Sequence, residues 1–472
     1  MNAPATDVAV TRELARYVVG LGYDDLPADT VDAAKDAVLD QFGIMLCGST
    51  LPWVRPIHDL AAVTGGRAES TVVGQGTRLP SMDAAMVNAG YGHSCEFDDS
   101  GYHGGCHPGA LAVPVALALA EAGRLSGRRF LLGVVLGYEV LYRIGRVITR
   151  PVLERGFHHQ SVVGPFGAAA VAANLLGLSD EQALHGLSIA GSHASGTMEY
   201  DQRGGEVKRF HSAMAARAGM VSALLARHGL TGPDTILEGR RGIARLFGHV
   251  EDTTGILSGL DDTSWFAVQG RLVKLYPNVG TLQTSIQAMA GLMAEHRFTH
   301  ADVTRVDAWV NPHTVTHGGS IFEPKDTIAA QFSMAFVLGV RLVHGRNELA
   351  DYMSAAVRED PRVVRIGRLL HIHGDTRYGQ ATEAVDFDTW HGARIRVELA
   401  DGRTVEAEEP YRKGSLRNPA TRAEKLAKFH GLASAVLDDG RAEALVEALD
   451  RLDEVDDVTE IIPLLVGKER AR

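Results

Sequence analysis

The sequence predicts a mainly α-helical protein with a smaller α+β domain, and three observations lead to this fold class. Residues 10–265 are rich in small and apolar helix-forming residues. Alternating strand patterns occur only in the later part of the chain, and helix signals then return near the C-terminus. We therefore expect an all-helical domain at 1–270, an α+β domain at 271–410 and C-terminal helices at 411–472.

Start and stop signals support the helices of the first domain. Ser179 and Gln182 have the spacing of a capping box, which satisfies free backbone amides at a helix start. Residues 212–228 are rich in alanine and leucine, and Gly229 follows where a helix commonly ends in a glycine. The segments that start at Leu111 and Phe166 are apolar on most faces, which predicts helices buried in the centre of the domain.

The second domain is predicted from one strand, one helix and one hairpin. Residues 303–310 alternate weakly like a strand, and residues 327–343 return to a helical pattern. Residues 394–408 alternate clearly around Asp401-Gly402, a pair that favours a tight turn between two strands. The segment 371–373 also alternates, and we interpret its two histidines as surface or lid structure.

Two further helices are predicted near the C-terminus. Asn418-Pro419 combines an N-cap residue with a proline at the first helical position. The segment 441–452 is amphipathic and charged.

Composition excludes several classes of function. The 472 residues include 47 basic and 58 acidic side chains, a net charge of −11, which argues against a general binder of nucleic acid or of membrane surfaces. Three cysteines exclude a disulfide scaffold and fit a reducing compartment. No basic segment followed by an apolar core begins the chain, and the apolar stretch 111–120 is about half a membrane span. We expect a soluble cytoplasmic protein.

Eight of the 20 histidines lie in the 119 residues from His93 to His211, and the segment 95–109 is the richest in chemistry there. It holds three carboxylates, two histidines, a tyrosine and four glycines, so it predicts an irregular loop with groups for acid–base catalysis. A metal site is the first alternative, with the candidate ligands Asp98, Asp99, His103, Cys106 and His107. Gly104-Gly105 breaks the helix that a His-x3-His zinc pair would need, and a structural loop is the second alternative.

Three other segments carry candidate residues. His158 and His159 precede a helix start, where backbone amides favour an anion; the alternative is that one histidine caps the helix and the other is solvated. Lys208 and His211 share a face if the segment is helical, although a solvated helix start is the simpler interpretation. Lys274 lies at the expected domain boundary, and interdomain clefts are common ligand sites.

Taken in order, these segments resemble the MmgE/PrpD family. The motifs are E-F-D-D-S…H-P-G-A, G-F-H…G-P-F-G-A-A-A, A-S-G-T-M-E…V-K-R-F-H-S, G-L-T-G-P…L-E-G-R-R-G, K-L-Y-P and P-K-D-T-I-A-A-Q-F-S-M-A-F. The family includes 2-methylcitrate dehydratases, cis-aconitate decarboxylases and an iminodisuccinate epimerase. The resemblance implies a helical domain, an α+β lid domain, C-terminal helices that pack back on the helical domain, and a homodimer. It also implies an active site between the domains that uses no metal and no organic cofactor.

The resemblance also implies roles for individual residues. His107 and His158 would form the acid–base pair, with Glu96 orienting His107, while Lys208 and Lys274 would hold carboxylates and stabilise the charge that develops beside them. The catalytic residues expected are Glu96, His107, His158 and Lys208. The substrate-binding residues expected are Ser100, Lys274, Tyr102, His103, His159, Arg209, His211 and Tyr276.

Three departures from the decarboxylase branch of the family concern the substrate. Glu96 and Ser100 stand where that branch has aspartate and threonine, residues 278–283 contain no histidine, and the stretch 99–107 is one residue longer. We therefore expect a lyase that dehydrates a small di- or tricarboxylic acid of the 2-methylcitrate type. The alternatives are an epimerase, a decarboxylase of the cis-aconitate type and a non-catalytic helical scaffold.

Overall fold

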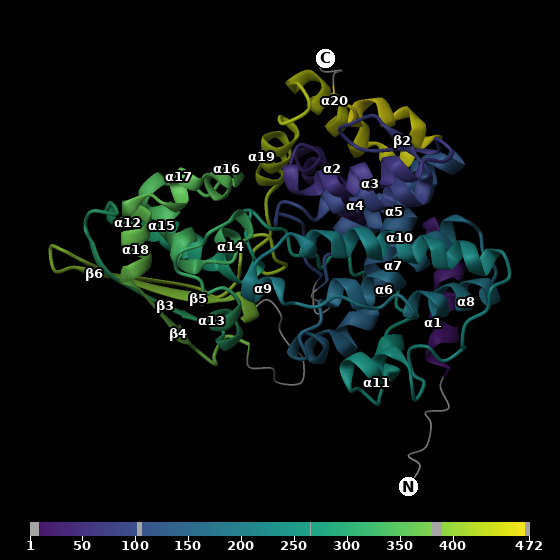
Figure 1. Cartoon of the computed structure of the whole chain (residues 1–472), viewed down its shortest axis with the longest axis horizontal. Helices are drawn as coiled ribbons and strands as arrows, with labels where there is room; N and C mark the ends of the chain where they lie inside the picture. Colours follow the sequence, from purple (N-terminus) through teal and green to yellow (C-terminus); the bar gives the residue numbers. More distant parts are fainter. Residues whose placement is uncertain (1–8, 102–105, 265, 380–388, 468–472) are drawn as a thin grey trace, which may run out of the picture.

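The structure is a computed structural model that describes residues 9–101, 106–264, 266–379 and 389–467. It has two hydrophobic cores. The first lies in the "helical body" and runs from Val10 to Val268 and again from Phe429 to Leu465. The second lies in the "sheet body" and runs from Val279 to Val405. Figure 1 shows the two bodies side by side, which confirms a mainly α protein with a smaller α+β part.

The helical body is built from two sets of helices and a short ribbon. The N-terminal set comprises α1 (Val10–Gly20), α2 (Ala28–Gly48), α3 (Arg55–Thr64), α4 (Ser81–Gly92), α5 (Gly109–Gly123), α6 (Gly127–Glu154), α7 (His159–Leu175), α8 (Asp180–Gly191), α9 (Tyr200–Arg203), α10 (Val207–Arg227) and α11 (Ile243–Gly248). The C-terminal set is α19 (Arg422–Ala433) and α20 (Asp439–Asp450). Strands β1 (Ser70–Thr71) and β2 (Arg78–Leu79) form an antiparallel ribbon.

Helices α5, α7 and α10 form the centre of this body, as their small apolar residues predict. Every residue of α7 is buried, and α10 packs along it. A Cβ atom at Gly219 of α10 would lie 2.3 Å from the side chain of Ala168 and 2.5 Å from the backbone nitrogen of Ala169. Only glycine permits this approach, which holds the start of α10 beside the start of α7.

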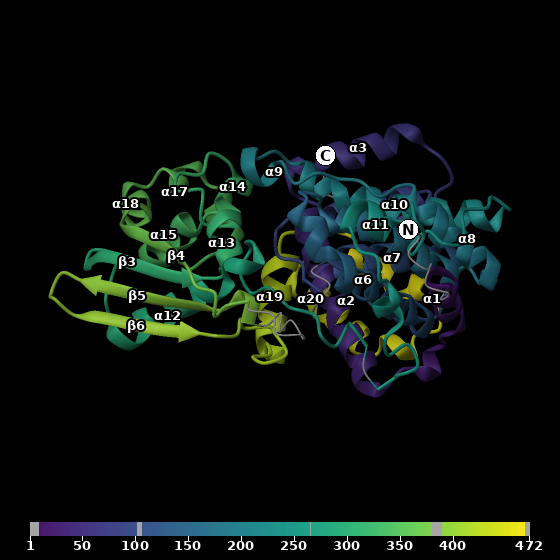
Figure 2. The same cartoon turned by 90° about the horizontal axis from the view of Figure 1, so that it is seen from below.

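The sheet body contains a four-stranded sheet in the order β4-β3-β5-β6. The strands are β3 (Val303–Val310), β4 (Leu370–Gly374), β5 (Ala393–Leu399) and β6 (Thr404–Glu409), and only the β3–β4 pair is parallel. Its helices are α12 (Gln283–His296), α13 (Pro312–His317), α14 (Thr327–Gln331), α15 (Met334–His344), α16 (Leu349–Met353), α17 (Ala355–Arg358) and α18 (Pro361–Leu369). In Figure 2 the sheet extends away from the helical body.

The predicted hairpin is confirmed in detail. Residues of β5 alternate between buried and half-buried positions, and Ile395, Val397 and Leu399 belong to the core. Gly402 has a φ of +87°, a left-handed conformation that glycine adopts without strain.

Two predicted helices differ from the structure. The helix expected at 327–343 is interrupted after Gln331, because the side chain of Ser333 accepts a hydrogen bond from the amide of Phe336 and starts a new helix. The helix expected to open at Asn418-Pro419 begins at Arg422 instead, where Thr421 and Glu424 form a capping box. The side chain of Asn418 donates to the carbonyl of Tyr411 and does not cap a helix.

The C-terminal helices lie against the helical body. Phe429 of α19 and Leu445 of α20 are buried in its core, so the chain crosses from the sheet body back to the helical body. Among the described helices, none combines the length and the apolarity needed to cross a bilayer.

Candidate active site

A cavity of about 110 Å³ lies where the two bodies meet, and both supply its walls. The helical body contributes Glu96, Ser100, His107, Leu153, His158, His159, Met198, Tyr200 and Lys208. Lys274 and residues of the sheet body complete it: Val279, Gly280, Thr281, His313, His317, Phe332, Trp390 and His391.

The loop between α4 and α5 carries the first group of site residues. Its described residues contain no helix, as predicted, and Glu96 has a φ of +54°, a left-handed conformation that is unfavourable for a residue with a side chain. Ser100 forms two backbone hydrogen bonds with Leu272, two residues before Lys274. The side chain of Gln331 donates to the carbonyls of Cys95 (2.8 Å) and Pro277 (3.0 Å). The surrounding structure therefore fixes the strained loop from two sides.

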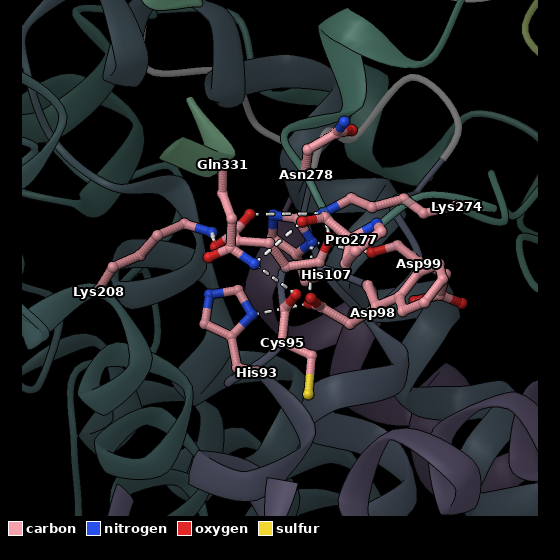
Figure 3. A network of polar contacts seen from close by, with 12 residues as sticks. His93, Cys95, Asp98, Asp99, His107, Lys208, Lys274, Pro277, Asn278 and Gln331 are labelled. Atoms are coloured by element: carbon pink, nitrogen blue, oxygen red, sulfur yellow. Dashed lines mark hydrogen bonds and ion pairs between the residues drawn. The ribbon is translucent and has the colours of Figure 1, made fainter. Parts of the chain in front are cut away.

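Glu96 is the centre of a buried ion cluster. Its carboxylate contacts Lys208 Nζ, and Lys274 Nζ lies 3.5 Å from the other carboxylate oxygen. Figure 3 shows Lys208 and Lys274 reaching the centre of the network from opposite sides. Burial alone would raise the pKa of Glu96, but the two lysines outweigh it and hold this pKa well below its ordinary value. Burial lowers the pKa of Lys274, an effect that Glu96 opposes.

Asp98 joins two histidines on the other side of this loop. One carboxylate oxygen of Asp98 lies 2.7 Å from His93 Nδ1 and 3.1 Å from His107 Nδ1 (Figure 3). His107 Nδ1 also lies 2.8 Å from the carbonyl of Asp99. These acceptors place the hydrogen on Nδ1 of His107 and leave its Nε2 toward the cavity. Asp98, and not Glu96 as predicted, therefore orients His107, because Glu96 is occupied by the two lysines.

Charge and burial set the protonation states of Asp98 and His93. Burial alone would raise the pKa of Asp98, but His93 and His107 outweigh it and leave this pKa well below its ordinary value. Burial lowers the pKa of His93 to about 4, against the opposing effect of Asp98. The backbone of His107 is held in turn by Gln160 of α7, whose side chain bonds both its amide and its carbonyl.

A third group comes from the starts of α7 and α10. His158 is the N-cap of α7, but its ring makes no cap hydrogen bond; its Nδ1 lies 2.8 Å from His211 Nδ1. Because α10 begins at Val207, Lys208 and His211 lie on one face of it, as predicted. Burial lowers the pKa of His158 well below its ordinary value and that of His211 to about 4. Both His158 and His159 are buried, so the alternative of a cap and a solvated ring is wrong.

Most of the predicted site residues meet at this cavity. Its walls include Glu96, Ser100, His107, His158, His159, Lys208 and Lys274. Tyr102 and His103 lie outside the described residues.

Three residues that were predicted to bind substrate do not line the cavity. Arg209 packs its guanidinium on Trp53, and its Nε donates to the carbonyl of Ser94. Tyr276 lies under the guanidinium of Arg341. His211 reaches the cavity through its contacts with His158 and Tyr200, two residues that line it.

The sequence-based search missed the residues that the sheet body contributes. His313 and His317 of α13 stack with centroids 4.9 Å apart, and His317 Nδ1 lies 3.3 Å from a carboxylate oxygen of Asp201 in the helical body. Phe332 lies over Lys208, with 5.6 Å between Nζ and the ring centroid. The sequence Asn311-Pro312 before two histidines four residues apart was a usable signal for the first pair.

The structure describes four of the five ligands proposed for the metal alternative, and these four do not form one group of metal-ligating atoms. Asp99 accepts hydrogen bonds from the Tyr138 hydroxyl and the amide of Gly109, where α5 begins. Burial raises the pKa of Cys106 to about 12, which keeps its thiol protonated. The group that does converge is His93, His107 and His158, with one nitrogen of each within 4.8 Å of the others.

Comparison with known families matches almost the whole chain. The family model for the MmgE/PrpD N-terminal domain matches residues 12–254, and the model for the MmgE/PrpD C-terminal domain matches residues 276–454. The first match covers the loop and helix starts described above, and the second covers the sheet body.

Individual relatives align over nearly their full length. A cis-aconitate decarboxylase of Aspergillus terreus is 27% identical, with 97% of this chain and 96% of the relative aligned. A cis-aconitate decarboxylase-like protein of Aspergillus oryzae is 29% identical (97% and 98% aligned). The cis-aconitate decarboxylase of Mus musculus is 27% identical (97% and 94% aligned).

Proposed function

Because the chain belongs to the MmgE/PrpD family, we propose that it is a lyase that acts on a small di- or tricarboxylic acid, using its own side chains for proton transfer. One observation carries this proposal. Two buried lysines that share a single carboxylate, Glu96, line the same cavity as His107 and His158. Such a cavity offers charge for a carboxylate and two imidazoles for protons within one enclosed space.

The lysines form the carboxylate-binding part of the site. Lys208 and Lys274 together carry two positive charges, and Glu96 neutralises only one of them. A substrate carboxylate beside these ammonium groups restores the balance and favours their charged forms. When a bond breaks at the neighbouring carbon, negative charge moves onto this carboxylate, and the fixed ammonium groups stabilise it without rearranging.

The histidines form the proton-transfer part. Nε2 of His107 is left free by the hydrogen bonds at Nδ1, so it can deliver or accept a substrate proton. A positive charge that develops on His107 during transfer faces Asp98 at 3.1 Å. The lowered pKa of His158 keeps it neutral, as a proton acceptor needs.

Decarboxylation is the reaction we propose first. The electrons of the C–CO2 bond pass into the substrate's adjacent double bond and onto the carboxylate held by the lysines. CO2 leaves as this bond breaks. His107, which enters the step with a second proton on Nε2, then gives that proton to the carbanionic carbon and becomes neutral. The support is the decarboxylases that align over 97% of this chain.

Dehydration of a 2-methylcitrate-like hydroxy acid is the second candidate. Here His158 takes the proton from the carbon beside the carboxylate, and His107 protonates the hydroxyl group as it leaves as water. Glu96 and Ser100, which depart from the aspartate and threonine of the decarboxylase branch, favour this reaction. An epimerase would use the same pair to remove a proton from one face and return one to the other.

The test is incubation with a panel of di- and tricarboxylates in D2O, followed by mass spectrometry and NMR. Decarboxylation gives a product that has lost CO2 and gained one deuteron, and dehydration gives loss of water. Epimerisation gives deuterium in an unchanged skeleton. If none of these acids reacts or exchanges a proton, the proposal is wrong.

A further inference from the structure

Three histidines meet at the base of the cavity from three different elements. His93 follows the end of α4, His107 lies in the loop before α5, and His158 is the N-cap of α7. Their ring centroids are 4.8 Å apart for His93 and His107, 5.9 Å for His93 and His158, and 6.5 Å for His107 and His158. One nitrogen of each ring lies within 4.8 Å of the other two.

The hydrogen bonds identify the nitrogens that remain available. Nδ1 of His93 is taken by Asp98, Nδ1 of His107 by Asp98 and the carbonyl of Asp99, and Nδ1 of His158 by His211. His93 is fully buried, and its Nε2 has no hydrogen-bond partner among the described residues. A buried nitrogen without a partner is costly, so each such atom needs an explanation. A bound cation explains the unpartnered nitrogen of His93 and also accounts for the two neighbouring rings.

The arrangement has the parts of a three-histidine metal site. Zinc binds imidazole nitrogens at about 2.0–2.1 Å, and tetrahedral angles then place those nitrogens about 3.4 Å apart. The nitrogens, which lie within 4.8 Å of one another, therefore need to approach by up to about 1.4 Å, which small rotations at Cβ provide. Each ring is already oriented through its other nitrogen, the pattern that holds histidine ligands in place.

Charged groups of both signs surround the three rings. Asp98 and Glu96 are the nearby carboxylates, and Lys208 and Lys274 are the nearby ammonium groups. Asp98 lies against two of the proposed ligands, whereas Lys208 is paired with Glu96. The negative charge of Asp98 thus lies against His93 and His107, which favours a cation at these two rings.

We propose that His93, His107 and His158 bind a divalent transition-metal cation of the Zn²⁺ type through Nε2, and that the ion inhibits the enzyme. Binding follows from the geometry alone. Inhibition rests on the proposed function, because an ion on His107 and His158 occupies the nitrogens that transfer the substrate proton.

Binding is tested without any activity assay. The purified chain, stripped with chelator, is titrated with Co²⁺ while visible absorption is followed, and Zn²⁺ is then added as competitor. We expect one equivalent of Co²⁺ to give the intense bands of a four-coordinate site, Zn²⁺ to displace it, and X-ray absorption of the zinc form to show three imidazole ligands. Absence of these bands, or a zinc site without imidazole, overturns the proposal.

Variants locate the site. His93→Gln removes one ligand and should weaken Zn²⁺ binding about 100-fold or more, since even a residue that only orients a ligand contributes 10–100-fold. His373→Gln, on strand β4 and away from the cavity, is the matched control and should bind Zn²⁺ like the wild type. Thermal melting checks that each variant is folded, and the X-ray absorption of the wild type decides the matter if His93→Gln does not fold. Equal Zn²⁺ affinity in folded His93→Gln and the wild type contradicts the assignment.

The inhibitory part has a separate readout. With a substrate found in the D2O panel, Zn²⁺ should reduce turnover over the same concentration range in which it displaces Co²⁺, and chelator should restore it. Zinc that binds at the three rings but leaves turnover intact contradicts inhibition and also the roles proposed for His107 and His158. Failure of the Co²⁺ titration alone leaves the proposed function untouched.

Discussion

Two carboxylates in this chain are each held by several cationic groups, and only one of them lies at a cavity. Glu96 contacts Lys208 and Lys274 where the two bodies meet. Asp307, on strand β3, contacts Arg305 (2.7 Å), Arg396 (3.3 Å) and His373 (2.8 Å). The cationic neighbours hold the pKa of Glu96 and of Asp307 well below the ordinary value.

The surroundings of the two clusters separate their roles. The side chains of Lys208 and Lys274 are only 4% and 1% exposed, whereas those of Arg305 and Arg396 are 39% and 37% exposed. Water therefore screens the excess charge around Asp307, whereas the two ammonium groups at Glu96 are buried and line a cavity that a ligand can enter. A cluster of charged side chains predicts a ligand site only when those side chains are buried and border a cavity.

Among the variants that test this comparison, loss of the proton-transfer group should reduce turnover most. His107→Asn keeps a polar side chain but removes the Nε2 that exchanges a proton with the substrate. We expect kcat to fall by about 10²–10⁴-fold, the usual contribution of a positioned acid or base. Steady-state kinetics on the substrate identified in D2O measures it. His371→Asn on strand β4 is the control, and equal loss in both variants would contradict the assignment.

Removal of one buried lysine should have the second largest effect on catalysis. Lys208→Met leaves Glu96 with Lys274 alone, so no positive charge remains for the substrate carboxylate. We expect kcat/KM to fall about 10²–10³-fold, as on removal of one group that stabilises developing charge. Arg396→Met makes the matching change at Asp307 and should leave kcat/KM within about twofold. A similar loss in Arg396→Met would show that the two clusters do not differ as described.

Asp98→Asn tests the positioning of His107. The amide retains the shape of the side chain but removes the negative charge between His93 and His107. We expect kcat to fall about 10–100-fold with KM nearly unchanged, because Asp98 contacts the proton-transfer group His107 and not the substrate. Asp98→Glu should recover part of the loss. A change confined to KM would place Asp98 in substrate binding instead.

Asp307→Asn should have the smallest effect and act on stability alone. Hydrogen bonds to charged groups contribute about 1.5–3 kcal/mol, and partly exposed arginines recover some of this from water, so we expect a loss of about 1–2 kcal/mol in the free energy of unfolding. Turnover should not change. Urea unfolding followed by circular dichroism measures the loss.

The pH dependence of that loss has a defined sign. The folded-state pKa of Asp307 is lowered, so its contribution is complete above the unfolded pKa of about 3.9 and disappears as the pH falls through the folded value. The difference in unfolding free energy between the wild type and Asp307→Asn should therefore be constant from pH 7 to about pH 5 and shrink below about pH 4. A difference that grows on acidification would contradict this account.

Local chemistry made much of the fold predictable. The capping box at Ser179 and the hairpin at Gly402 follow from interactions between near neighbours in the sequence. The interruption at Ser333 was missed because the pattern of residues 327–343 is helical throughout. The break depends on a single hydrogen bond, in which the Ser333 side chain accepts from the backbone amide of Phe336.

The site was only partly predictable for a related reason. Motifs named Glu96, Lys208 and Lys274, but no motif states that the carboxylate of Glu96 contacts these two lysines and not the histidine eleven residues further on. The arrival of His313 and His317 depends on how the two bodies meet, and pairings between distant segments leave little trace in a single sequence. The role of Asp98 depends on how one irregular loop folds, which no helix or strand pattern predicts.

Solvent deuterium transfer tests the central claim most directly. The claim is that the cavity at Glu96 moves a proton at a carbon beside a bound carboxylate, whereas the cluster at Asp307 only stabilises the sheet. The deuterium incorporated per turnover and the turnover rate are measured in D2O for wild type, His107→Asn and Asp307→Asn. We predict one deuteron at a single carbon in the wild type and in Asp307→Asn at equal rates, and a rate about 10²–10⁴-fold lower in His107→Asn. Undiminished deuterium transfer in folded His107→Asn would contradict the account.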